Sequence, residues 1–361
     1  MTAEGSLERL FWQVGRDPRR LPTLPPPTRQ LCYRLGRRYA TLGQWYQALQ
    51  GHPAWEQLPQ REQDMLLGGA KLAHAQAQRL LWELDRVDRA LWGLDFRPML
   101  LKGAAYLLDG HAFARGRWVG DLDLLFAEEH LPAAERALLA HGWEFVHTTP
   151  QDQRYYRQLT HELPPLVHRH RGGELDLHRA ISHPLGPWPV SGSSLLAAGR
   201  PLPHWPGWTL PTHADLALHA VLHLFADADF TQPRGPRDML DLAALLESCA
   251  AMPGFWEDLA RRAAQWRVEI PLALALATLE WAGISPVPPQ SRAMLPEQRS
   301  WRTFAVRHAL QAALTPRLED VNGTIPAWAA LGLRLRGLRL RLPPGRLVSH
   351  LWSKWRRGGW G

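Results

Sequence analysis

Two aspartates on one predicted strand are the residues best suited to chemistry. Residues 117–126 read RWVGDLDLLF, and alternation along a strand turns Asp121 and Asp123 to one side while the leucines face the core. Two buried carboxylates repel each other, and a divalent cation is the usual remedy. The alternative is a strand end with two solvated aspartates. From repulsion alone, replacing both by asparagine would leave the melting temperature unchanged or slightly raised.

A second polar motif comes before the aspartates. Residues 96–108 read as a short apolar strand that runs through Lys102 and Gly103 into a helical pattern. A glycine at a strand-to-helix turn lets backbone N–H groups approach an anion, and the helix N-terminus favours negative charge. We therefore expect a phosphate-binding turn at Gly103, followed by a helix, Arg117 and the two aspartates.

The order of these motifs resembles the bacterial nucleotidyltransferase-like proteins of the DNA polymerase beta superfamily. There, a Leu-Lys-Gly strand end precedes an arginine, three residues and an Asp-x-Asp strand, as in residues 101–103, Arg117 and residues 121–125 here. The resemblance continues through a helix at 128–141, the segments at 161–166 and 175–178 and the helical segment 219–241, and so covers roughly residues 96–246. Gly103-Ala104 stands where the superfamily has Gly-Ser or Gly-Gly, and the gap to Asp121 is longer than in the minimal enzymes. This departure leaves phosphate binding to backbone N–H groups and to Lys102.

The resemblance implies an α+β fold, with a polymerase beta-like mixed sheet as the nucleotidyltransferase core and helical regions at both ends. It implies a metal-dependent nucleotidyltransferase that moves an NMP group from an NTP, with ATP as the first expectation, to an acceptor hydroxyl and releases pyrophosphate. Two divalent cations, Mg²⁺ or Mn²⁺, would be bound by Asp121, Asp123 and Asp176. The nucleotide would contact Lys102, Gly103, Ala104, Arg117, His219 and His223.

The third carboxylate of this set comes from the segment ELDLH at 174–178. Alternation places Glu174, Asp176 and His178 on one strand face, and the alternative is a hairpin with one wet face. Asp176 matches the family position and lies between two leucines, whereas Glu174 adjoins a Gly-Gly turn. We therefore expect Asp176 to complete the cluster and to help deprotonate the acceptor.

A helix carries a row of polar residues. Asp215, His219, His223 and Asp227 recur every four residues and so share one side of a helix. Two histidines at this spacing can bind zinc, but the glutamate of the zincin pattern is missing. The resemblance makes the two histidines a wall of the nucleotide pocket, and ordinary buried histidines are the alternative. Asp241 matches a family aspartate, for which a salt bridge or helix cap is the structural alternative.

Two rival functions stay open. The first is a catalytically silent relative that binds a nucleotide or a partner, suggested by the missing serine. The second is an enzyme that transfers another phosphate-linked group to a peptide or polysaccharide. No motif names the acceptor, which for the nucleotidyltransferase is a peptide, a sugar or a small molecule.

The length of 361 residues predicts two or three domains. We divide the chain into an N-terminal helical region (1–95), the nucleotidyltransferase core (96–185), a Pro/Trp-rich connector (186–211), a helical domain (212–320) and a basic amphipathic tail (321–361). In the first region, apolar residues at 73–91 predict a long amphipathic helix, and residues 21–27 predict a stiff connector. Strands are expected near 99–101, 119–126, 143–146, 163–170 and 174–180, with a hairpin turn at 171–173 and a loop at 183–211.

The chain has 42 basic and 34 acidic residues, and the whole excess lies beyond residue 320, where there are eight cations and no acid. Read as a helix, the tail has an apolar stripe of Trp328, Leu331, Leu335, Leu338 and Leu342. One interpretation docks this helix on the body of the protein. The other attracts it to an anionic surface such as a membrane, a nucleic acid or an acidic acceptor.

The two cysteines lack metal or redox spacing, which fits a reducing compartment. The acidic N-terminus has no apolar segment typical of an export signal, and no apolar run reaches membrane-spanning length. The sequence therefore predicts a cytoplasmic protein without a transmembrane segment.

Overall fold

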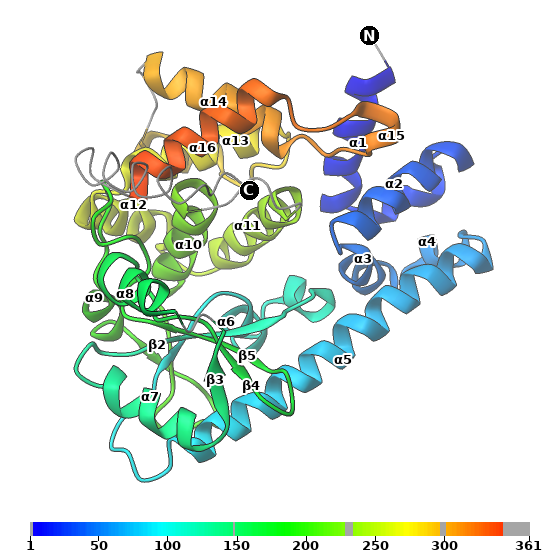
Figure 1. Cartoon of the computed structure of the whole chain (residues 1–361). Coiled ribbons are helices and arrows are strands. Elements are labelled where there is room, and N and C mark those ends of the chain that lie inside the picture. Colours follow the sequence, from blue (N-terminus) through cyan, green and yellow to red (C-terminus); the bar gives the residue numbers. More distant parts are fainter. Residues whose placement is uncertain (1–2, 147–148, 228–233, 297–300, 342–361) are drawn as a thin grey trace.

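The structure is a computed structural model that describes residues 3–146, 149–227, 234–296 and 301–341. It has an N-terminal group of helices, a seven-stranded mixed sheet and a C-terminal group of helices (Figure 1). The mixed α+β architecture expected from the sequence is confirmed.

The N-terminal region is helical, as expected. Its elements are α1 (Ala3–Arg16), η1 (Pro18–Thr23), α2 (Pro26–Arg38), α3 (Leu42–Leu49), α4 (Pro53–Glu56) and α5 (Gln60–Ala90). The predicted long amphipathic helix is confirmed in α5, which buries Leu80, Leu84 and Val87 and runs from the N-terminal helices to the sheet (Figure 1). The stiff connector at 21–27 is wrong. That segment is the end of a 3-10 helix and the start of α2, because proline is compatible with the first turn of a helix.

The sheet has the order β3-β4-β5-β2-β1-β7-β6. Its strands are β1 (Met99–Leu100), β2 (Asp121–Leu125), β3 (Trp143–Phe145), β4 (Leu166–His168), β5 (Glu174–His178), β6 (Arg200–Pro201) and β7 (Thr209–Leu210). The pairs β2·β5 and β1·β7 are parallel and the other neighbours are antiparallel. All five expected strands are present, each somewhat shorter than expected, and the turn at 171–173 does join β4 to β5.

The segment expected to be a loop contributes to the sheet. Between residues 183 and 211 lie α9 (Gly192–Leu196) and the hairpin of β6 and β7, and β7 pairs with β1 through Met99 and Thr209. The expectation of a plain loop was therefore wrong. Strands of two residues leave no alternation to read, and the pairing satisfies backbone groups beside the buried β1.

Helices cover the sheet and fill the C-terminal half. Those near the sheet are α6 (Lys102–Leu108), η2 (Ala112–Gly116), α7 (Leu131–Ala140) and α8 (Pro150–Leu159). The C-terminal elements are α10 (His213–Leu222), η3 (His223–Asp227), α11 (Gly235–Ala250), α12 (Phe255–Trp266), α13 (Glu269–Trp281), η4 (Pro289–Met294), α14 (Trp301–Leu314), α15 (Glu319–Asn322) and α16 (Ala327–Arg341).

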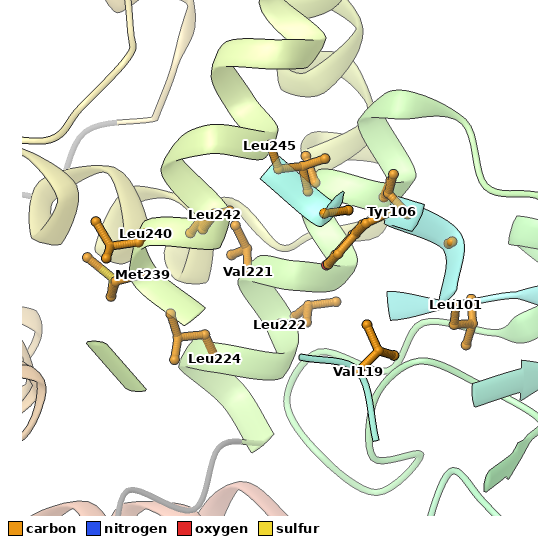
Figure 2. Packing of buried hydrophobic residues seen from close by; sticks show 14 of the residues in the cluster. Leu101, Tyr106, Val119, Val221, Leu222, Leu224, Met239, Leu240, Leu242 and Leu245 are labelled. Carbon is orange, nitrogen blue, oxygen red and sulfur yellow. The ribbon is translucent and has the colours of Figure 1, made fainter. Parts of the chain in front are cut away.

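The core is continuous between the sheet and the C-terminal helices. Figure 2 shows Leu222 of α10 near Tyr106 and Val119, with Leu242 of α11 and Leu101 in the same cluster. All five side chains are buried. α10 is therefore held against the segments that carry the polar motifs.

Helices from the two ends of the chain also touch. In α1, Arg16 donates a hydrogen bond to the carbonyl oxygen of Ile284 (3.0 Å). In α2, Arg34 forms an ion pair with Asp320 of α15 (2.5 Å). The N-terminal helices thus close onto the C-terminal ones.

The last described helix, α16, packs through a different face from the one expected. Ala329 and Leu333 are buried, whereas Trp328, Leu331 and Leu335 are each more than half exposed. The predicted stripe is therefore not the docked face, because small residues let α16 lie close to α14. Leu342 and the rest of the tail lie outside the described residues. Within the described part of the chain, no helix is both long and apolar enough to span a membrane.

Candidate active site

The site is built on two adjacent parallel strands. β2 and β5 pair in register, with Asp123 opposite Asp176 and Leu124 opposite Leu177. Both leucines are buried, so their packing fixes the two strands in the core. The carboxylates of Asp123 and Asp176 are thereby held on one face of the sheet.

The turn before β5 is fixed by α5. Arg171 forms a buried ion pair with Glu83 of α5 (Nη2 to Oε2, 3.0 Å), and its guanidinium lies 4.8 Å from the Trp143 ring centre. A Cβ at Gly173 would lie 2.6 Å from the Glu83 carboxyl carbon. Glycine is therefore required there, and the long helix sets the start of the strand that carries Asp176.

Asp123 is the most constrained of the site residues. It is 2% exposed, and its Oδ1 accepts hydrogen bonds from Lys102 Nζ (2.6 Å) and His178 Nε2 (2.9 Å). Burial alone would raise the pKa of Asp123, but the Lys102 charge and the His178 hydrogen bond hold it well below its ordinary value. Burial would likewise lower the pKa of Lys102, and the Asp123 charge raises it instead. The pair is therefore ionised.

The pKa of Asp176 is shifted in the opposite direction from that of Asp123. Burial, and then the negative charges of Asp123 and Glu162, raise its pKa to about 7. Among the described residues, no donor makes a hydrogen bond to the Asp176 side chain. The charges of His178 and Lys102 offset this only in part, so the Asp176 carboxylate lies beside other negative charges, which is the arrangement that a bound cation relieves.

The other two acidic residues of these strands are placed less tightly. The Asp123 charge, followed by burial, raises the pKa of Asp121, which is the predicted repulsion. Asp121 lies opposite Glu174 at the open end of the pair, and Glu174 is exposed. Among the described residues, neither belongs to a group of metal-ligating atoms that lie within 4.8 Å of one another.

The turn into α6 differs from the expected glycine turn. The helix begins at Lys102, whose φ of +45° places a non-glycine residue in the left-handed region at a cost of about 1–2 kcal/mol. A Cβ at Gly103 would lie 2.8 Å from Arg117 Nη1 and from Val119 Cγ1. The close approach of these two side chains explains the glycine without a ligand. Ala104 is 1% exposed and belongs to the core.

Arg117 is held by the C-terminal helices. Its Nε donates to Asp241 Oδ2 (2.6 Å) on α11, and Gln44 of α3 donates to the other carboxylate oxygen (2.8 Å). The salt bridge considered for Asp241 is therefore present. Although Arg117 forms no hydrogen bond or ion pair with Asp121 among the described residues, its charge lowers the Asp121 pKa against the Asp123 charge and burial.

The polar row on α10 is divided among different environments. Asp215 is fully buried and receives two hydrogen bonds from Arg262 of α12 (2.5 and 2.9 Å). His219 is buried, and burial followed by the Lys102 charge lowers its pKa well below the ordinary value. His223 is exposed and begins the π-helix η3. Packing around its imidazole and then the Lys102 charge also lower the pKa of His223, to about 3, although part of the residue is exposed, so the Lys102 charge acts on both histidines of this row. The side chain of Asp227 lies outside the described ones.

Three histidine and glutamate residues at the site were not selected from the sequence. His178 hydrogen-bonds Asp123, and a β-bridge joins it to Glu162, which follows His161. The alternation of the ELDLH segment already placed His178 beside Asp176, so a signal for it existed. His161 and Glu162 come from an irregular segment, and only the tertiary structure brings them to β5.

These residues fit a divalent cation. Ligand atoms of Asp123, Asp176 and His178 lie within 4.8 Å of one another. The carboxylate oxygens of Asp123 and Asp176 suit Mg²⁺ and Mn²⁺, whereas His178 Nε2 is engaged in its hydrogen bond with Asp123. The donor set and the raised pKa of Asp176 both favour positive charge at this position.

A comparison with protein families gives a match that includes this site. Residues 26–283 match the family model described as uncharacterised nucleotidyltransferase. No curated protein and no solved structure matched the chain.

Proposed function

The chain belongs to the uncharacterised nucleotidyltransferase family, and from this we propose that it moves an NMP group from an NTP to the hydroxyl group of an acceptor and releases pyrophosphate. ATP is the expected donor, and a peptide, a sugar or a small molecule is the expected acceptor. The observation that carries this proposal is the in-register pair of Asp123 and Asp176, with Lys102 beside it.

Asp121, Asp123 and Asp176 would bind two divalent cations, Mg²⁺ or Mn²⁺. Such cations supply a clamp on the attacking and leaving oxygens of an in-line displacement. The Asp176 carboxylate would accept the proton of the acceptor hydroxyl. Because its uncharged form is stabilised by burial, this carboxyl group can hold a proton near neutral pH.

The cationic residues would act on the phosphates. Lys102 Nζ reaches Asp123 from the first turn of α6 and would neutralise negative charge beside it. Backbone groups at Gly103 and Ala104 would approach the triphosphate. Arg117, held by its ion pair with Asp241, would stabilise the charged form of Asp121 without binding the cation itself. His219 of α10 and His223, the residue that follows α10, would contact the nucleotide.

A matched pair of variants tests the proposal. Asp176→Asn should lower turnover far more than ATP affinity, because the residue is expected to act on the attacking oxygen. Glu174→Gln, on the same strand but exposed, should change neither by much. Binding of Mg-ATP is measured by calorimetry, and pyrophosphate release is measured with a panel of peptides, sugars and small alcohols. The reverse order of the two variants would refute the assignment of Asp176.

A specific contact favours one alternative, a relative that binds nucleotide without turnover. The Lys102 ammonium lies 2.6 Å from Asp123 Oδ1, so a built-in cation already neutralises this carboxylate. The Gly103-Ala104 turn also lacks the serine hydroxyl of the superfamily. Such a protein would bind Mg-ATP and release no pyrophosphate with any acceptor of the panel. Its Lys102→Met variant would bind Mn²⁺ more strongly than the parent, because the Asp123 carboxylate would lose the built-in cation.

A further inference from the structure

A second cluster of potential ligands lies on the other side of His178. His161, Glu162 and His178 offer ligand atoms within 4.8 Å of one another. Glu162 Oε2 is 3.8 Å from His161 Nε2 and 3.9 Å from His178 Nδ1. Both distances are too long for hydrogen bonds, yet none of the three side chains is exposed.

The cluster is held rigidly. The carbonyl oxygen of His161 accepts a hydrogen bond from Arg179 N (2.9 Å), and the next residue, Glu162, bridges to His178 of β5. Leu163 N then donates to the carbonyl oxygen of Leu177 (2.8 Å). The segment 161–163 thus extends the sheet beside β5 and fixes the three side chains relative to one another.

The hydrogen bond to Asp123 determines which nitrogen of His178 carries a proton. Asp123 is the anionic partner of Lys102, 2.6 Å away, and a carboxylate can only accept, so His178 Nε2 must donate to it. In the neutral imidazole, Nδ1 then has a lone pair and no proton. This lone pair faces the Glu162 carboxylate, so two acceptors confront each other across 3.9 Å.

Among the described residues, no hydrogen-bond donor reaches the Nδ1 atom of His178. His178 is 0% exposed, and its Nδ1 makes no hydrogen bond. A buried acceptor without a partner destabilises the fold, so the arrangement is unfavourable as it stands. A cation between the nitrogens and the carboxylate would remove this cost.

We propose that His161 Nε2, Glu162 Oε2 and His178 Nδ1 bind a divalent transition metal ion of the zinc class. Two imidazoles and one carboxylate are a known ligand set for Zn²⁺ and leave a fourth position open. Tetrahedral Zn²⁺ with bonds near 2.1 Å separates its ligands by roughly 3.4 Å, so the two distances need to shorten by about half an ångström. In such sites a carboxylate often accepts a hydrogen bond from the second nitrogen of a metal-binding histidine and so orients its ring. Asp123 would do this for His178 through Nε2.

The new site and the proposed Mg²⁺ or Mn²⁺ site differ in the kind of ligand that they offer. His178 belongs to the transition metal, and the Mg²⁺ or Mn²⁺ ligands proposed above are carboxylates only. The new site stands on the contacts of His161, Glu162 and His178 and does not require NMP transfer. Its metal would fix the position of Asp123 through His178.

Metal titration of the full chain without a histidine tag tests the proposal. After removal of metals by a chelator, Co²⁺ should bind with the visible absorption of a tetrahedral nitrogen and oxygen site, and Zn²⁺ should displace it at one ion per chain. Glu162→Gln and His161→Gln should each weaken Zn²⁺ binding by roughly 100-fold or more. His170→Gln, an exposed histidine on the nearby turn, is the matched control and should bind Zn²⁺ like the parent.

A second variant distinguishes this site from the first one. Asp176→Asn should keep Zn²⁺ affinity, because Asp176 is not among the three proposed ligands. If Asp176→Asn abolishes Zn²⁺ binding, or if Zn²⁺ affinity is the same in Glu162→Gln and the parent, the proposal is wrong. Circular dichroism of each variant establishes that it is folded, and Glu162, which is the most exposed of the three, is the substitution least able to disturb the fold.

Discussion

Asp123→Asn should destabilise the protein in the absence of added metal. The substitution leaves the Lys102 ammonium without its ionic partner 2.6 Å away. Breaking a buried ion pair from one side costs about 3–5 kcal/mol. Because the Lys102 side chain keeps 21% of its exposure and can recover some hydration, we expect about 2–3 kcal/mol. For a chain of this size that corresponds to a fall in melting temperature of roughly 3–4 °C.

Asp121→Asn is the matched control. Its carboxyl pKa is raised chiefly by the charge of Asp123, so removal of the Asp121 charge relieves repulsion. Its melting temperature should be unchanged or slightly raised. The expectation drawn from repulsion alone thus still holds for Asp121, and the contact with Lys102 reverses it for Asp123.

Thermal unfolding in EDTA, followed by circular dichroism, measures both effects. Lys102→Met completes a double-mutant cycle with Asp123→Asn, and the coupling free energy between the two sites should be about 2 kcal/mol. A coupling near zero, or equal melting temperatures for Asp121→Asn and Asp123→Asn, would refute the reasoning. Lys102 also carries a positive φ, so Lys102→Gly is a second control that removes the charge and fits the backbone.

Three further predictions follow from other regions. Burial raises the pKa of Cys32 to about 11 and that of Cys249 to about 12, so neither thiol should react with DTNB at pH 8 until the protein is unfolded. Asp109 is held in its charged form largely by hydrogen bonds, including two from Arg200, and its pKa lies below the ordinary value despite burial. It therefore stabilises the fold above about pH 4 and loses this effect as the pH falls further, so the difference in unfolding free energy between the parent and Asp109→Asn should shrink on acidification from pH 7 to pH 3. Truncation near Arg334 should abolish any salt-sensitive retention on anionic liposomes or nucleic acid, and unfolding of the truncated chain would instead favour a purely docked helix.

Local patterns predicted much of the fold. Alternation predicted β2 and β5, and spacing at three and four residues predicted α5, because these signals lie within single elements. The order of motifs identified the family, which the match over residues 26–283 confirms. The proposed roles of Asp121, Asp123 and Asp176 stay predictions.

The remaining features depend on contacts between distant residues. Arg117 binds Asp241, 124 residues further on, and nothing near either residue in the sequence marks this pairing. His161 and Glu162 reach β5 only through the tertiary fold. β6 and β7 are too short to show alternation; β7 forms because β1 offers it backbone groups to pair with, and β6 in turn pairs with β7.

The contacts between the two ends of the chain also bear on how the protein folds during synthesis. The ionic partner of Arg34, Asp320, lies 286 residues further along the chain. At about 5–20 residues per second, the ribosome takes roughly 15–60 s to supply it. Over that interval α2 has no α15 to pair with, whereas Arg16 of α1 meets its partner Glu247 earlier. The packing of α2 is thus completed among the last steps, and a chaperone that binds the nascent chain would find this face of α2 accessible for most of the elongation time.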